Sequence, residues 1–406
     1  MLSTKYLILL LSLLLPFVAP FAKTSFKDAA DILSGHSSVV AIERNSQGLK
    51  ERGEVEGSWG DPQVSVAFKN FPRDTLASDE TPMTGIEFGV AQKIALTPKY
   101  ARKQKSWDSF GDAEAFAAKD HYRVLLKNFW QILITEKLIR EKRKVFKENL
   151  NSISKILKTS KRLYANGRGS QQAVLDIQIR KTEIESGLQS LGFERSQVKD
   201  QLSYLLGEKA PSFDYSSTPW KKLLSLNTKG EDFKEKSLKA KVQAKNYQHQ
   251  AMQLNMVPDI QVKLGYTKRS NIDGRGDFVS AMISLPLPFS QTKYAGKAQA
   301  YYEKESMQKS LVNYQRFKEN ELSVLSTQIA RIQNELEILN QKTLRFAENS
   351  QKITYKSYAL GNSSYNDLLQ SDLKLQELYL KRINFQSSLE KAYLSLKFLK
   401  GEKLYE

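Results

Sequence analysis

The sequence contains no cysteine, three histidines, and few residues that break regular structure, with 20 glycines and 11 prolines among 406 residues. Without cysteine, the chain forms no disulfide, binds no metal through thiolates and has no thiol nucleophile. The histidines (His36, His121 and His249) lie far apart, and no zinc-protease, paired-carboxylate or phosphate-loop motif occurs. These absences argue against an enzyme, and we expect no cofactor and no metal site.

What the sequence has in abundance is charge. Charged residues make up 26% of the chain, and the formal net charge is +18. Together with the low glycine and proline content, this favours long solvated helices over a loop-rich fold. A basic chain is compatible with nucleic acid, anionic lipid or an acidic partner. Between Arg140 and Lys161, however, the basic residues alternate with apolar positions, which indicates a solvated helix face.

The N-terminus predicts export. Lys5 precedes an apolar run from Tyr6 to Phe21, and the small residues Ala19 and Ala22 follow near its end. We interpret residues 1–22 as a signal peptide. The alternative is a membrane anchor, but about 16 residues are few for a span that needs about 20. Export argues against nucleic acid as a partner.

Two segments at an offset of 194 positions share the pattern Tyr-Ala-x-Gly-x-x-Ser: Tyr164 to Ser170 and Tyr358 to Ser364. The same offset also matches Lys99-Tyr100-Ala101, Leu175, Glu183, Leu205 and Gly207 with residues of the second half. Several matches at one offset indicate an internal duplication. We therefore predict a first repeat over 23–207, a connector in the equatorial region over 208–230, and a second repeat over 231–406. Each repeat is expected to hold a helix, a strand pair and a helical hairpin.

Strands are predicted where apolar residues alternate with polar or small ones, because side chains of a strand point to opposite faces in turn. The alternating apolar positions form four groups: Val64, Val66 and Phe68; Ile86, Phe88 and Val90; Ile260, Val262, Leu264 and Tyr266; Val279, Ala281, Ile283 and Leu285. Polar loops, 70–84 and 268–277, separate the members of each pair.

Helices are predicted where apolar residues recur every three or four positions, as in Phe146, Leu150, Ile153 and Leu157. The apolar stripes are narrow, which is typical of coiled-coil seams. A helix from about 112 to 163 would be roughly 75 Å long. Gly167 and Gly361 are suited to the left-handed backbone that ends a helix. Ser170 and Ser364 are suited to cap the next helix.

Four strands per chain are too few to close a membrane barrel, which needs about eight or more. Open edge strands must be paired or they aggregate. Three chains would supply about twelve strands, an even number like that of bacterial barrels. The long helices would then project away from the membrane.

With these features the chain resembles the TolC-like outer-membrane efflux factor family, in its heavy-metal and multidrug branch. The residues that carry the resemblance stand in the expected order over almost the whole mature chain: Gly60-Asp61-Pro62-Gln63, Asn70-Phe71-Pro72-Arg73-Asp74, Thr81-Pro82-Met83-Thr84-Gly85, Val257-Pro258-Asp259 through Tyr266, Ser284-Leu285-Pro286-Leu287-Pro288, and the two Tyr-Ala-x-Gly-x-x-Ser segments.

The resemblance implies a mainly α fold with short β-strands, assembled as a homotrimer. It implies a twelve-stranded barrel in the lipid of the outer membrane of a Gram-negative-type cell, and an α-helical tunnel through the periplasm. It also implies docking to a periplasmic adaptor and an inner-membrane pump. The protein would be a passive, gated exit duct for efflux or secretion, with a drug, a metal ion or a protein as cargo.

The resemblance also implies site residues. Tyr164, Gly167, Ser170, Tyr358, Gly361 and Ser364 fall on the adaptor-docking hairpin tips. Asp367 matches the first of two aspartates that ring the family's closed entrance. The second falls on Gln370, so the acidic ring is weaker here unless Asp372 or Asp176 substitutes. The alternative is that the glycines are plain helix caps and that Asp367 is an acid favoured by the helix dipole.

Two further questions stay open from the sequence. The rival function is a periplasmic coiled-coil scaffold protein of the cell envelope, although a pure coiled coil needs no alternating strands. If the basic residues line the lumen, the duct would favour anionic cargo. If they lie on the outer helical face, they carry no such preference.

Overall fold

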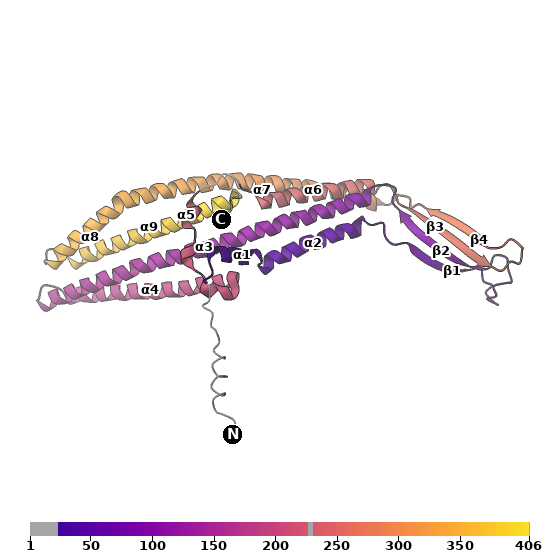
Figure 1. Cartoon of the computed structure of the whole chain (residues 1–406). Coiled ribbons are helices and arrows are strands. Elements are labelled where there is room, and N and C mark those ends of the chain that lie inside the picture. Colours follow the sequence, from indigo (N-terminus) through magenta and orange to yellow (C-terminus); the bar gives the residue numbers. More distant parts are fainter. Residues whose placement is uncertain (1–22, 226–229, 406) are drawn as a thin grey trace, which may run out of the picture. The chain divides into compact units, whose positions relative to one another are not determined.

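The computed structural model describes residues 23–225 and 230–405, so the predicted signal peptide, 1–22, lies outside the described residues. The chain divides into two compact units. Among the described residues, the helical unit comprises 23–36, 121–225, 230–231 and 320–405. The sheet unit comprises Ser37–Asp120 and Asp232–Glu319. Each unit therefore takes segments from both halves of the sequence, and Figure 1 shows the elements by their place in the chain.

The sheet unit contains one antiparallel sheet with the strand order β1-β2-β3-β4. The strands are β1 (Gln63–Lys69), β2 (Gly85–Ile94), β3 (Ile260–Arg269) and β4 (Phe278–Ser284). All four strands were predicted from alternation, and both predicted pairs, β1–β2 and β3–β4, are present. The sequence did not predict that β2 pairs with β3, which joins the two strand pairs into one sheet. Within the described residues, β1 and β4 are the edges of this sheet.

Helices support the sheet. The sheet unit also holds α2 (Ser37–Gly57), α6 (Phe233–Leu254) and the first parts of α3 (Lys99–Ala165) and α7 (Gln291–Ile338). Helix α3 begins at Lys99, well before the predicted start near 112, because its first turns pack on α2 and α6. The Ser106 hydroxyl donates to the Ala244 carbonyl (2.9 Å), and the Ser46 hydroxyl donates to the Gly111 carbonyl (2.7 Å). With 67 residues, α3 is about 100 Å long at 1.5 Å per residue.

The helical unit holds the remainder of α3 and α7 together with shorter segments. These are α1 (Phe26–Ser34), α4 (Gln171–Leu206), η1 (Gly207–Ser212), η2 (Tyr215–Ser217), α5 (Trp220–Leu224), the π-helical turn η3 (Leu339–Thr343), α8 (Leu344–Ala359) and α9 (Tyr365–Leu399). Helices α3 and α4 form one hairpin, and α8 and α9 form the other. The predicted connector thus contains η1, η2 and α5, with 226–229 outside the described residues.

The aromatic core of the helical unit fixes α1 and the C-terminal segment to α3. Phe26 of α1 packs at a tilt against Phe129 and Trp130 of α3, with ring centroids 5.3 and 4.9 Å apart. The Trp130 indole N–H donates to the Leu404 carbonyl (2.8 Å), so the buried polar atom of this side chain is satisfied. Because one buried tryptophan contacts both, the two chain ends of the described region are anchored to the middle of α3.

Candidate functional site

The two hairpin tips end their first helix in the same way. Gly167 has φ +70° and Gly361 has φ +84°, the left-handed conformation that favours glycine. The Arg168 N–H donates to the Leu163 carbonyl (2.8 Å), and the Asn362 N–H donates to the Ser357 carbonyl (2.9 Å). Together with the glycine N–H bonds, these contacts form a Schellman motif at each tip. The predicted role of both glycines as helix stops is confirmed.

The serines that follow are N-caps, as predicted, but they cap differently. The Ser170 hydroxyl accepts from the Ala173 N–H (3.1 Å). The Ser364 hydroxyl accepts from the Asp367 N–H (3.1 Å), and the Asp367 carboxylate accepts from the Ser364 N–H (3.2 Å), which completes a capping box. Asp367 therefore stabilises the first turn of α9 through this capping box.

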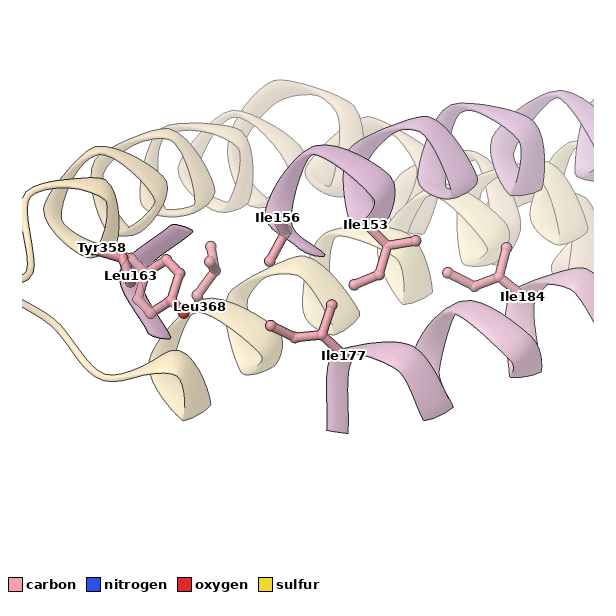
Figure 2. Packing of buried hydrophobic residues seen from close by; sticks show 7 residues of the cluster. All are labelled: Ile153, Ile156, Leu163, Ile177, Ile184, Tyr358 and Leu368. Carbon is pink, nitrogen blue, oxygen red and sulfur yellow. The ribbon is translucent and has the colours of Figure 1, made fainter. Parts of the chain in front are cut away.

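The two tips pack against each other through one apolar cluster, shown in Figure 2, and its tyrosines are not equivalent. Tyr358 is buried in this cluster at 6% exposure, whereas Tyr164 is 48% exposed. The other buried members of the cluster are Ile153, Ile156, Leu163, Ile177, Ile184 and Leu368. At the tips Tyr164 is thus exposed to solvent, while Tyr358 holds the two hairpins together. The sequence pattern contains no signal that distinguishes these two tyrosines.

The acidic candidates occupy three different environments. Asp367 and Gln370 are exposed on the first turns of α9. Asp176 of α4 is half-buried and accepts a hydrogen bond from the Tyr365 hydroxyl, which raises the pKa of Tyr365. Asp372 is buried at 5% exposure. The structure therefore brings Asp176 beside the start of α9 and leaves Asp372 inside the contact between hairpins.

Asp372 belongs to a polar group that links α3, α4 and α9. The Ser152 hydroxyl of α3 donates to the Asp372 carboxylate (3.3 Å). Arg180 of α4 bonds to Gln376 of α9 and to Glu183 (2.9 Å). Burial raises the pKa of the Asp372 carboxyl, although the Ser152 hydrogen bond and the Arg180 charge act in the opposite direction. A titratable group thus lies within the hairpin contact.

The sheet has two chemically different faces. One is apolar, because the register aligns the alternating residues across all four strands. Its exposed members are Val64, Val66, Phe68, Phe88, Val90, Leu264, Tyr266, Val279 and Ile283. The opposite face carries small and charged side chains, with Glu87 of β2 paired to Lys69 of β1 and Lys263 of β3. A contiguous exposed apolar face of this kind marks a site of contact with a membrane or a protein.

Residues 23–225 and 230–405 contain no group of three or more metal-ligating side chains. No helix in this part of the chain combines the length and the apolar character that a membrane crossing requires.

Comparison with known proteins shows the fold. No family model and no curated protein matches the chain. Solved outer-membrane proteins match nearly all of it: VceC from Vibrio cholerae (TM-score 0.78, 14% identity, covering 93% of this chain and 96% of that one) and the Campylobacter jejuni CmeC channel (TM-score 0.71, 12% identity, 94% and 86%). The open Neisseria gonorrhoeae MtrE channel also matches (TM-score 0.70, 11% identity, 94% and 90%). The chain has the fold of these outer-membrane proteins, as the resemblance in its sequence predicted.

Proposed function

We propose that the protein is the outer-membrane exit duct of a tripartite efflux or secretion system and conducts its cargo passively. Three copies would close a twelve-stranded barrel, and their helices would form a tunnel in the periplasm. The observation that carries this proposal is a four-stranded sheet with one exposed apolar face and two edges, β1 and β4, in a chain with the fold of outer-membrane channels.

The physical argument starts from the apolar face. Burying apolar surface is worth about 25 cal/mol per Å², so nine exposed apolar side chains on one face strongly favour a nonaqueous environment. In lipid, the backbone groups of β1 and β4 must also be paired, because no water reaches them. Closure with further copies of the same sheet satisfies both requirements at once. The described chain offers no other strand for these edges.

The same proposal assigns the hairpin tips to a periplasmic adaptor that links the duct to an inner-membrane pump. The exposed tip residues Tyr164 and Leu360 would make the contact, whereas the buried Tyr358 would hold the tip geometry. Asp367 and Gln370, exposed on α9, are the better candidates for the periplasmic gate. Asp372 would act from within the hairpin contact. A photoreactive residue at Asn166 or Leu360 should crosslink to the adaptor in cells with an active pump.

The test of the duct uses neighbouring positions on opposite faces of β1. Val66→Arg places a charge on the apolar face, where the cost in lipid is about 2–4 kcal/mol. Ala67→Arg places the same charge on the polar face, opposite Glu87 in register. We expect wild type and Ala67→Arg to assemble as trimers in the outer-membrane fraction, and Val66→Arg to fail. Recovery of the wild type in the soluble periplasmic fraction would refute the duct and support the coiled-coil scaffold.

A further inference from the structure

The polar face of the sheet carries a group of three charges, one each from β1, β2 and β3. The Lys263 ammonium lies 2.8 Å from the Glu87 carboxylate, and Lys69 pairs with the same carboxylate. The Glu87 side chain is only 3% exposed, whereas those of Lys263 and Lys69 are 27% and 43% exposed. The acid is thus covered, and the two ammonium groups form the accessible surface of the group.

Small residues make room for this group. Ser65, Gly89, Gly265 and Ser280 stand opposite one another in register across the four strands. A Cβ at Gly265 would lie 3.0 Å from the Glu87 carboxyl carbon, and a Cβ at Gly89 would lie 2.7 Å from Cε of Lys263. Larger residues would displace these charged side chains. The sheet therefore holds the carboxylate and the lysine stems in a fitted recess.

The other charges of this face lie nearer the ends of the strands. Arg269 pairs with Asp273 (2.8 Å), and Lys93 shares Asp259 with Lys99 of α3 (3.2 and 2.7 Å). Lys69 and Lys263 share a single carboxylate, so their group retains one positive charge. Because the covered atom is the acid, an approaching solute meets the positive charge first.

We propose that Lys69 and Lys263 form a cationic site on the inward face of the duct, which selects anionic cargo over cationic cargo of the same size. The cargo class is small molecules with carboxylate, sulfonate or phosphate groups. This inference rests on the proposed function, because only closure into a barrel puts the polar face on a passage. Three copies would then place three such sites around one ring, the arrangement that favours anions in pores.

The absence of cysteine provides a direct probe of the local potential. Ser280→Cys introduces the only thiol of the chain beside the charged group, since the Ser280 hydroxyl lies 2.8 Å from the position of a Gly265 Cβ. We would measure its modification in outer-membrane vesicles by an anionic and a cationic methanethiosulfonate of matched size. Val279→Cys reports the opposite face with the same reagents.

The expected result is faster modification of Ser280→Cys by the anionic reagent. Neutralising both lysines (Lys69→Gln with Lys263→Gln) should lower the anionic-to-cationic rate ratio about tenfold at low salt, because each charge acts within a few ångströms in water. Glu87→Gln should raise the ratio. Lys268→Gln, on the outer face of β3, should leave it unchanged.

Three outcomes contradict the reasoning in separable ways. If substitutions at Lys69, Lys263 and Glu87 all leave the anionic-to-cationic rate ratio unchanged, the cationic site is overturned but the duct is not. Rapid modification of Val279→Cys by both reagents shows that the apolar face meets water, and this overturns the proposed function as well. A strong cation preference of the purified trimer in a planar bilayer also overturns the selection of anions.

Discussion

Replacing Gly167 by alanine tests the geometry of the first hairpin tip. Gly167 has φ +70°, and a Cβ at this position would meet no atom within 4 Å. The cost therefore comes from the backbone conformation alone. An alanine in the left-handed region costs roughly 1–2 kcal/mol, which corresponds to about a 5- to 30-fold larger population of open tips.

Trypsin reports this opening, because Arg168 is exposed and its N–H closes the Schellman bond to Leu163 (2.8 Å). Cleavage after Arg168 in the native protein should accelerate by about the same 5- to 30-fold, provided that opening is fast relative to cleavage. Rates are normalised to peptides spanning Tyr164 to Ser170 with and without the substitution. This step removes any preference of the protease itself.

Gly192→Ala is the matched control. Gly192 lies in the interior of α4, has a helical backbone and would also meet no atom within 4 Å as alanine. Alanine there should stabilise the helix by about 0.5–1 kcal/mol, so cleavage at Arg168 should not accelerate. The reasoning fails if the normalised rate of Gly167→Ala equals that of the wild type, or if Gly192→Ala accelerates cleavage equally.

Three further predictions concern the two hairpins and the contact between them. Leu368→Ala removes a fully buried side chain and should destabilise this contact by about 2–5 kcal/mol, measured by thermal unfolding of the protein. Leu360→Ala removes a side chain that is 73% exposed, so it should leave the stability of the contact unchanged. Equal losses of stability from both substitutions would contradict the packing. Ser364→Ala removes the capping box and should destabilise the start of α9 by about 1 kcal/mol. Hydrogen exchange of the Leu368 amide should therefore become roughly fivefold faster, and an unchanged exchange rate would count against the cap. Burial raises the pKa of Asp372 in the folded state. Its protonated carboxyl therefore contributes fully to folding stability below the pKa that it has in the unfolded chain, and this contribution is lost as the pH rises through its pKa in the folded protein. The isosteric Asp372→Asn should flatten this dependence in melts between pH 4 and 7, and an unaltered pH profile would refute the assignment.

Local patterns made the strands and tips predictable. Alternation at Val64, Val66 and Phe68 marks a strand with unlike faces, and the structure gives β1 these faces. Gly167 and Ser170 mark a helix stop and a cap three residues apart, and the structure forms both. These features depend on backbone conformation and hydrogen bonds within a few residues, which a sequence specifies directly.

Contacts between distant segments were not predictable in the same way. The start of α3 at Lys99 depends on packing against α2 and α6 rather than on an apolar stripe in its own sequence. Tyr164 and Tyr358 occupy identical motifs, yet only Tyr358 is buried. The sequence offers Asp372 as a substitute for the second aspartate of the entrance ring, yet its side chain is buried and accepts a hydrogen bond from Ser152, 220 residues away in the sequence. Each outcome depends on which surface a second hairpin covers.

The sequence by itself therefore determined the elements of this protein: four short alternating strands, long narrow-seamed helices, and two glycine-serine tips. Tertiary structure alone decided that β2 pairs with β3, that Glu87 lies between Lys69 and Lys263, and that Asp372 is buried. The physical reason is the sequence separation over which each kind of interaction acts. Dihedral preferences and side-chain periodicity act over a few residues, whereas burial and charge pairing depend on segments that meet only when the chain has folded.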